Sequence, residues 1–218
     1  MEDLLLGIEA LEFLKKEGFP ILESRITISE ETAASYAKDI GFPVTLKVSS
    51  KTIIHKTELN GVKPFLLNEK EVRSAFNELV HTFNTLGRTK DINGIIVQEM
   101  GKGLEFIVGV YVDSQFGHTI MFGQGGIYVE AIKDVSFRPI PIARKDAKEM
   151  IQELDAWKII TSPRQKRINP VMIEDFLLKI SDFVETHKNV EEMDINPVFV
   201  SEKISICDAR IKIGPKNK

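Results

Sequence analysis

Two carboxylates, an amide and an arginine lie near one another in the last part of the chain, where they could bind a metal ion and a phosphate. Asp194 and Asn196 belong to one alternating apolar run, Asp208 and Arg210 belong to a second, and the short polar segment 201–203 separates the two. Alternating runs around a short polar break predict a β-hairpin. Oxygen ligands on neighbouring strands are what Mg²⁺ requires when it bridges phosphates.

The register of this hairpin decides whether the four side chains meet. A three-residue loop places Asn196 opposite Asp208 and Asp194 opposite Arg210. Opposed residues point to the same face of an antiparallel pair, so we expect the four to form a cluster on the face of the apolar tip residues. Those tip residues are Val198, Val200, Ile204 and Ile206. A two- or four-residue loop would move Asp208 to the other face, and the alternative is an ordinary half-buried hairpin with an Asp–Arg surface pair.

A lysine and a histidine in the N-terminal part could also contact phosphate. Lys47 stands between Leu46 and Val48, so we expect it on the polar face of a strand, where a lysine can bind phosphate. The segment 49–63 combines hydroxyls, lysines, His55 and an Asn-Gly turn whose N–H groups can bind an anion. His55 could donate a hydrogen bond to phosphate or accept a phosphoryl group. The alternatives are a lysine on an edge strand and an ordinary surface histidine.

A glycine-rich segment, 122–126, joins two expected strands, and Glu130 and Arg138 follow it. It predicts either a hairpin with unusual backbone dihedrals or a loop whose backbone closely approaches a ligand or a partner. The remaining histidines have no metal-ligand spacing with one another. The sequence has no nucleophile elbow, no Walker A motif and no paired-histidine helix motif.

Composition restricts the compartment and the class of ligand. The 218 residues carry a formal net charge of −3, which argues against bulk binding to nucleic acid or a membrane surface. Cys207 is the only cysteine, so an intrachain disulfide is excluded and a reducing compartment is indicated. The acidic start and the short longest apolar stretch, 106–112, predict neither a secretory signal nor a membrane span. We therefore expect a soluble, cytoplasmic protein.

Hydrophobic periodicity predicts an α+β chain with two lobes, 1–97 and 98–218, and a hinge at 98–101. The expected helices cover residues 4–14, 29–40, 68–83, 147–154 and 169–184, and three of them begin at a capping Ser29, Asn68 or Asn169. The expected strands cover residues 44–48, 94–100, 104–112, 118–123 and 127–138, followed by the terminal hairpin.

Several motifs in a fixed order resemble the ATP-grasp subunit of ADP-forming (NDP-forming) acyl-CoA synthetases, which include acetate–CoA ligase. In chain order they are Gly41-Phe42-Pro43-Val44, Leu46-Lys47, Ile54-His55-Lys56-Thr57, Asn60-Gly61-Val62-Lys63, Val97-Gln98-Glu99-Met100, Glu105 to Val110, Phe122 to Glu130, Asp134 to Arg138, Asp194-Ile195-Asn196-Pro197 and Asp208-Ala209-Arg210. The resemblance covers about residues 9–211. The chain departs from the family pattern at Ser49 to Lys51, at Asn60, at the short loop 101–103 and at 162–165.

This resemblance implies an ATP-grasp fold, with a nucleotide held between two α+β lobes. The site residues it implies are Gln98, Glu99 and Met100 at the adenine ring, Lys47 on phosphate, Glu105 in the nucleotide site, Asn196 and Asp208 on Mg²⁺, and His55 and Arg138 as catalytic residues. His55 would be the phosphohistidine of this subunit. Phosphoryl transfer needs mainly positioning and charge neutralisation, which Lys47, a metal ion and an arginine can provide.

By the same resemblance, the net reaction converts acyl-CoA, ADP and phosphate into free acid, CoA and ATP, reversibly. His55 would receive the phosphoryl group from a histidine on a companion CoA-binding subunit and pass it to ADP. The sequence carries no Rossmann-type glycine fingerprint, so we expect a hetero-oligomer and no complete reaction by this chain alone. One alternative is a non-catalytic nucleotide-binding subunit with a structural or regulatory role. A carboxylate–amine ligase acting alone is disfavoured, because it would leave His55 without a role.

Overall fold

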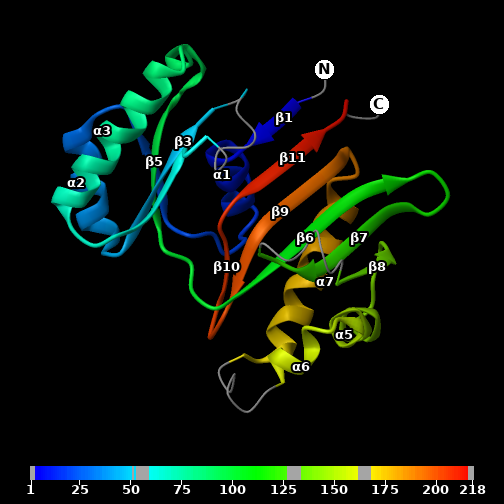
Figure 1. Ribbon diagram of the computed structural model, residues 1–218. Coiled ribbons are helices and arrows are strands. Elements are labelled where there is room, and N and C mark those ends of the chain that lie inside the picture. Colours follow the sequence, from blue (N-terminus) through cyan, green and yellow to red (C-terminus); the bar gives the residue numbers. More distant parts are fainter. Residues whose placement is uncertain (1–2, 51, 53–58, 127–133, 162–167, 216–218) are drawn as a thin grey trace. The chain divides into compact units, whose positions relative to one another are not determined.

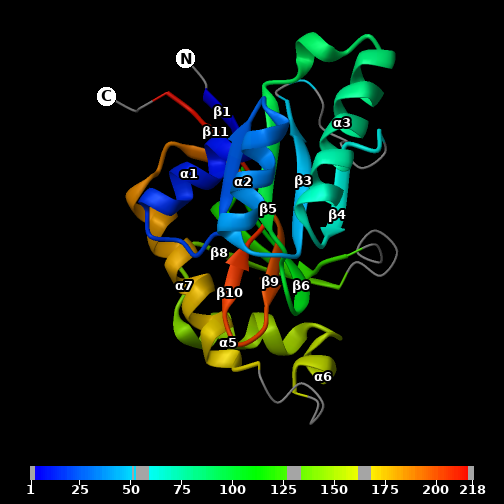
Figure 2. The same ribbon diagram turned by 90° about the vertical axis from the view of Figure 1, so that its left-hand side faces the viewer.

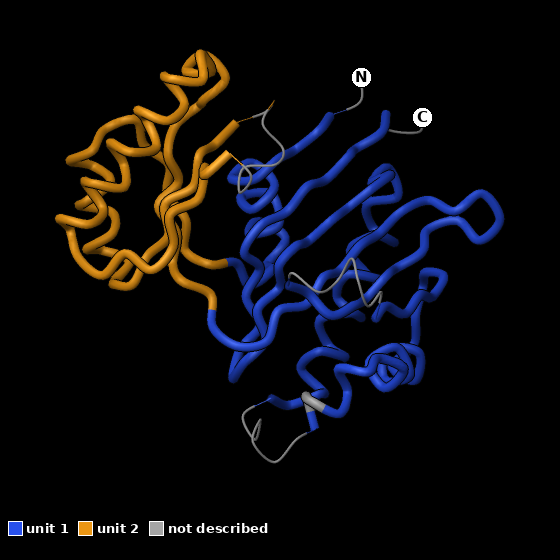
Figure 3. Tube along the Cα trace, viewed as in Figure 1, with its two compact units in different colours: residues 1–21, 102–218 blue, residues 22–101 orange. Residues whose placement is uncertain are grey.

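The computed structural model describes residues 3–50, 52, 59–126, 134–161 and 168–215. The chain divides into two compact units, shown in Figure 3: residues 1–21 with 102–218 form unit 1, and residues 22–101 form unit 2. This grouping differs from the expected lobes 1–97 and 98–218 because β1 (Asp3–Leu6) pairs with β11 (Ala209–Ile213) and so joins the first residues to unit 1. The second passage between the units follows the expected hinge segment, after residue 101.

Unit 1 is built on an antiparallel sheet with the strand order β1-β11-β9-β6-β7-β8, in which β10 also pairs with β9. The strands not yet given are β6 (Leu104–Asp113), β7 (Gly117–Gln124), β8 (Val135–Pro139), β9 (Val190–Val200) and β10 (Ile204–Ile206). Each of the long central strands, β6 and β9, therefore has a neighbour on both sides.

Helices cover one face of this sheet. They are α1 (Ile8–Lys16), α5 (Arg144–Glu153), α6 (Trp157–Ile160) and α7 (Pro170–Thr186). Phe106, Val108 and Val110 of β6 point to this side, are at most 1% exposed and share one apolar core with the helices. Figure 1 looks onto the other face, with α1 and α7 behind the strands, and the turned view in Figure 2 shows the two layers from the side. None of the described helices of unit 1 covers the face of this sheet that is seen in Figure 1, which we call the open face.

Unit 2 repeats this two-layer arrangement on a smaller scale. Its sheet has the order β2-β5-β3-β4. The elements are β2 (Ser24–Thr27), α2 (Glu30–Ile40), β3 (Val44–Ser49), β4 (Val62–Leu66), α3 (Glu69–Thr85), a 3₁₀ turn (Thr89–Asp91) and β5 (Gly94–Glu99). Val44, Leu46 and Val48 of β3 are fully buried in a core shared with α2 and α3. The alternate residues of β3 therefore point to the face that these helices leave open.

Most of the predicted elements are confirmed. Ser29, Asn68 and Asn169 each accept a hydrogen bond from a backbone N–H in the first turn of α2, α3 and α7, as their sequence positions indicated. The first predicted helix is wrong at its start, because residues 3–6 form β1 and α1 begins only at Ile8. Pairing of β1 with β11 outweighs the helical spacing of the leucines there. None of the helices in the described ranges has the length and apolar character needed to cross a membrane.

Substitution of Gly103 tests the packing at the start of β6. This glycine has φ +112°, and a Cβ there would overlap the carbonyl of Val200. We predict that Gly103→Ala lowers the free energy of unfolding by about 2–4 kcal/mol, because both the backbone conformation and the space exclude a side chain. Gly117→Ala is the matched control, since Gly117 has φ +74° with no atom within 4 Å of the added Cβ, and should cost only about 1 kcal/mol. Equal losses in urea unfolding would contradict the proposed overlap.

Candidate functional site

The terminal hairpin forms in the predicted register. Its tip pairs across the loop 201–203 as expected, and Arg210 lies opposite Asp194. Between these pairs the backbone N–H of Asn196 donates to the carbonyl oxygen of Asp208 over 3.1 Å. The two candidate metal ligands are therefore direct neighbours on adjacent chain segments.

The face on which this cluster lies differs from the prediction, because β9 carries a bulge. Phe106 of β6 pairs with Val198, whereas Val108 pairs with Ile195, so the register between the two strands shifts by one residue. Two residues of β9, at 196–197, therefore oppose one residue of β6. Such a shift exchanges the two faces of a strand.

The burial pattern follows this exchange. The buried apolar residues of β9 near the bulge are Met193, Ile195, Val198 and Val200. Before the bulge the odd-numbered residues of this set are buried, and after it the even-numbered residues are buried. We expected Asn196 and Asp208 on the face of Val198 and Val200, and that expectation is wrong. Asp194 and Asn196 are exposed on the open face, opposite the side that packs on the helices.

In this cluster the Asp194 carboxyl has a raised pKa, and one donor of Arg210 lacks an acceptor among the described residues. Although Asp194 reaches the surface, neighbouring groups shield its carboxyl in part from water, and this partial loss of hydration raises its pKa. The nearby negative charge of Glu192 raises this pKa further. Arg210 counteracts part of this effect, while Asp208 adds to it. The Nε atom of Arg210 is buried and has no hydrogen-bond partner among the described residues. Such an unsatisfied donor costs about 1–3 kcal/mol, so the site is short of one acceptor.

The donor set on this face fits a magnesium ion that arrives with a phosphate. In the part of the chain that the structure describes, no three Asp, Glu, His or Cys side chains gather as a metal cage. Asn196 and Asp208 can supply only an amide oxygen and a carboxylate. Mg²⁺ is commonly held by one or two carboxylates and completes its octahedron with phosphate oxygens and water.

Glu105 lies at the start of β6, exposed, beside the glycine-rich segment. The N–H of Gly125 donates to its carbonyl oxygen over 2.7 Å, and a Cβ on Gly125 would overlap the Glu105 backbone. The glycine is therefore needed for a close approach within the chain itself.

Lys47 lies on the open face of unit 2, as predicted. It is partly buried, and its neighbours Leu46 and Val48 point to the helices on the other side. Its strand, β3, pairs with both β4 and β5, so the alternative of an edge-strand lysine is wrong.

Residues 98–100 lie at the end of β5 and just after it, and each of their side chains takes part in a hydrogen bond. Gln98 is buried, and its Nε2 donates to the Ser24 hydroxyl over 2.8 Å. The Glu99 carboxylate accepts from a backbone N–H at 3.4 Å. The Thr45 hydroxyl donates to the sulfur of Met100. These contacts hold the segment predicted to meet the adenine ring.

Arg138 is not brought to the cluster. It lies opposite Ile120, which is fully buried on the helix-covered side of the sheet. Its guanidinium donates to Glu153 over 3.1 Å and lies 3.7 Å from Glu149, both on α5. This arrangement joins β8 to α5, and it offers no support for the catalytic role predicted for Arg138.

Some predicted features lie outside the described residues. These are His55, Glu130 and the loop 162–165. Asn60, which follows the segment of His55, has φ 54° and thus adopts the left-handed conformation expected of the Asn-Gly turn.

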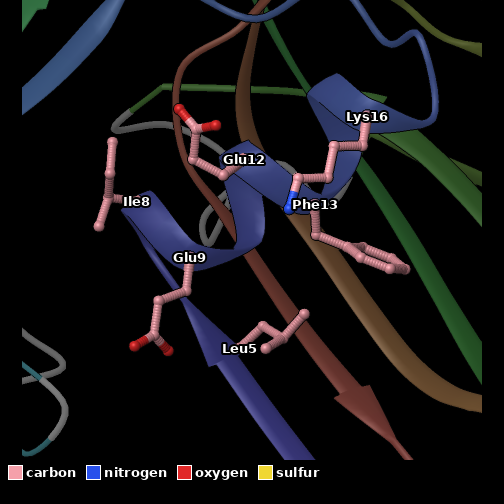
Figure 4. A pocket seen from close by; sticks show the side chains of 6 residues that line it. All are labelled: Leu5, Ile8, Glu9, Glu12, Phe13 and Lys16. Carbon is pink, nitrogen blue, oxygen red and sulfur yellow. The ribbon is translucent and has the colours of Figure 1, made fainter.

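A surface hollow elsewhere in unit 1 contains none of the predicted residues. Figure 4 shows the side chains of α1 and β1 that line it: Leu5, Ile8, Glu9, Glu12, Phe13 and Lys16. The surface of this hollow is mainly apolar, although Glu9, Glu12 and Lys16 lie at it.

Known proteins match this chain over nearly its whole length. Residues 1–213 match the model of the ATP-grasp domain. The β subunit of ADP-forming acetate–CoA ligase I from Pyrococcus furiosus is 40% identical over 206 residues, which are 93% of this chain and 89% of that protein. ADP-forming acetate–CoA ligase II from Archaeoglobus fulgidus is 39% identical over 99% of this chain, but the chain spans only 31% of its length.

Solved structures of one enzyme share the fold. The dinucleotide-forming acetyl-coenzyme A synthetase 1 of Ca. Korarchaeum cryptofilum, in complex with coenzyme A and Ca-AMPCP, superimposes with a TM-score of 0.88 at 38% identity, covering 96% of this chain and 93% of that chain. In a second structure, with Mg-AMPPCP, its phosphohistidine segment points towards the nucleotide-binding site (TM-score 0.82, 36% identity, 96% and 92% covered). The chain therefore belongs to the ATP-grasp domain family, among the ATP-grasp subunits of ADP-forming acyl-CoA synthetases.

Proposed function

We propose that this chain is the nucleotide-binding subunit of a cytoplasmic, ADP-forming acyl-CoA synthetase. It transfers a phosphoryl group from a histidine to ADP, reversibly, within the overall conversion of acyl-CoA, ADP and phosphate into acid, CoA and ATP. The observation that carries this proposal is the pairing of Asn196 with Asp208 beside Arg210, in a chain 40% identical to a named β subunit over nearly its whole length. An amide, a carboxylate and a guanidinium form a suitable environment for Mg²⁺ and phosphate.

Further residues are assigned to nucleotide binding in this proposal. Lys47 contacts phosphate, Glu105 contacts the nucleotide, and the segment 98–100 binds adenine. Support comes from the position of Lys47 and of the Asn196–Asp208 pair on the open faces of their own sheets. Asn196 and Asp208 hold Mg²⁺, which neutralises phosphate charge when bound.

The chemical step requires a histidine that can carry a phosphoryl group, and we assign it to His55. A β-phosphate oxygen of ADP attacks phosphorus, a P–O bond forms, and the P–N bond to the imidazole breaks. The freed imidazole nitrogen keeps its electron pair. In the reverse direction this nitrogen attacks the γ-phosphorus of ATP. The sequence motif and the phosphohistidine segment named in the Korarchaeum structure support this assignment.

A second subunit completes the enzyme. The relatives called β subunits imply a separate partner, and we propose that it binds CoA and selects the acyl group. The Archaeoglobus relative extends far beyond the part matched here, which is consistent with further functions on additional chain.

Removal of the Asp208 carboxylate tests the metal site. We predict that Asp208→Asn and Asp208→Ala lower the Mg²⁺-dependent affinity for ADP by about 10-fold or more, because a charged ligand to the ion is lost. Calorimetric titration with ADP, with and without Mg²⁺, measures this. Asp182→Ala removes an exposed carboxylate on α7 and should leave the affinity unchanged. Unchanged Mg²⁺ dependence in both Asp208 variants would exclude Asp208 from the site.

Substitution of His55 tests the proposed function itself. We predict that His55→Gln retains Mg-ADP binding but loses acid-labile phosphate incorporation from ATP and all turnover with the CoA-binding partner, because the amide cannot carry phosphate. Intact-mass spectrometry after incubation with Mg-ATP detects the phosphohistidine, and His81→Gln, on the exposed surface of α3, is the matched control. Either subunit alone should show no turnover. Near-normal turnover of His55→Gln with the partner would leave His55 without a catalytic role.

A further inference from the structure

Arg210 is the arginine that faces the proposed metal site. It follows Asp208 by two residues and lies opposite Asp194 on β9 and Leu6 on β1. Its strand buries Ala209 and Ile211 against the helices, so Arg210 points to the open face together with Asp194. The guanidinium therefore lies on the same side of the sheet as the candidate ligands of Mg²⁺.

The hydrogen bonding of Arg210 is incomplete. Its Nε–H is buried, yet no described residue accepts a hydrogen bond from it. Buried donors in native proteins nearly always have a partner, so a buried donor without one among the described residues is a position where an acceptor group can bind. The Nε–H and a neighbouring Nη–H of arginine form a fork that matches two oxygens of a phosphate.

The arginine suggested by the sequence motifs, Arg138, lies on the other side of the sheet. Arg138 is engaged by Glu149 and Glu153 of α5 on the helix-covered side of the sheet. On the open face, by contrast, the Nε–H of Arg210 has no acceptor within the described ranges of the chain. The acidic neighbours Asp194 and Asp208 would repel an anion that came alone, so the acceptor is expected to enter together with a divalent ion.

We propose that Arg210 binds the phosphoryl group that is transferred at this site, through its Nε–H and one Nη–H, and so neutralises charge next to the metal ion. The inference rests on the proposed function and adds a residue to it. Arg210 makes and breaks no covalent bond. It favours the state in which the phosphoryl group is present, and it therefore distinguishes ATP from ADP.

Binding of two nucleotides separates this role from a structural one. Calorimetry on the purified chain with Mg²⁺ compares ADP with the non-hydrolysable ATP analogue AMPPCP for wild type, Arg210→Lys and Arg210→Gln. We expect both variants to lose about 10-fold or more in affinity for AMPPCP and less than about 3-fold for ADP. Lysine keeps the charge but not the fork, so Arg210→Lys should resemble Arg210→Gln. Arg144→Gln, which removes an arginine paired with Glu174 and Asp175, is the control and should change neither affinity.

Three outcomes of the calorimetry decide whether Arg210 binds the transferred phosphoryl group. A selective loss for AMPPCP in both variants supports the inference. Equal losses for the two nucleotides, or no loss, overturn it and leave Arg210 as a supporting residue of the hairpin, while the proposed function stands. A wild-type chain that binds neither nucleotide contradicts the proposed function itself, and the inference with it. Because Arg210→Lys preserves charge and most of the side-chain volume, it keeps the test decisive if Arg210→Gln does not fold.

Discussion

The site depends on a one-residue bulge in β9. Without it, the alternation that buries Val198 and Val200 against the helices would also bury Asn196. Two residues of β9 opposite one of β6 reverse the alternation, so the strand keeps an apolar side throughout and still presents Asp194 and Asn196 to the open face. The segment between β10 and β11 follows the same change of face, because the N–H of Asn196 still donates to the carbonyl oxygen of Asp208. The bulge thereby reconciles a continuous core with a polar site.

This arrangement follows from a sheet that is covered on one side only. Helices bury one face in each unit, and polar groups are tolerated on the other. Lys47 in unit 2 and the Asn196–Asp208 pair in unit 1 both occupy such faces. Arg138 shows the opposite case, because on the covered face it requires two carboxylates of α5 as partners. Arg138 and Arg210 therefore lie on opposite sides of the same sheet, and only Arg210 shares a side with Asp194.

Sequence reasoning predicted what depends on neighbours along the chain. The hairpin register followed from a three-residue loop between alternating runs, and the helix starts followed from Ser29, Asn68 and Asn169. It failed where distant strands decide the outcome. The face of Asn196 depends on the pairing of β9 with β6, and the strand at residues 3–6 depends on β11, more than 200 residues away. Arg210 was visible in the hairpin, but its unsatisfied Nε appears only once the strands are assembled.

We propose that Asn196 and Asp208, on the open face of unit 1, bind the metal ion that holds the phosphates of the nucleotide. A crystal structure of the chain with ADP and Mn²⁺, which replaces Mg²⁺ and scatters anomalously, tests it most directly. We predict one anomalous peak within bonding distance of the side-chain oxygens of Asn196 and Asp208, with a phosphate oxygen as a further ligand. A peak bound to ADP but to neither of these residues would contradict it.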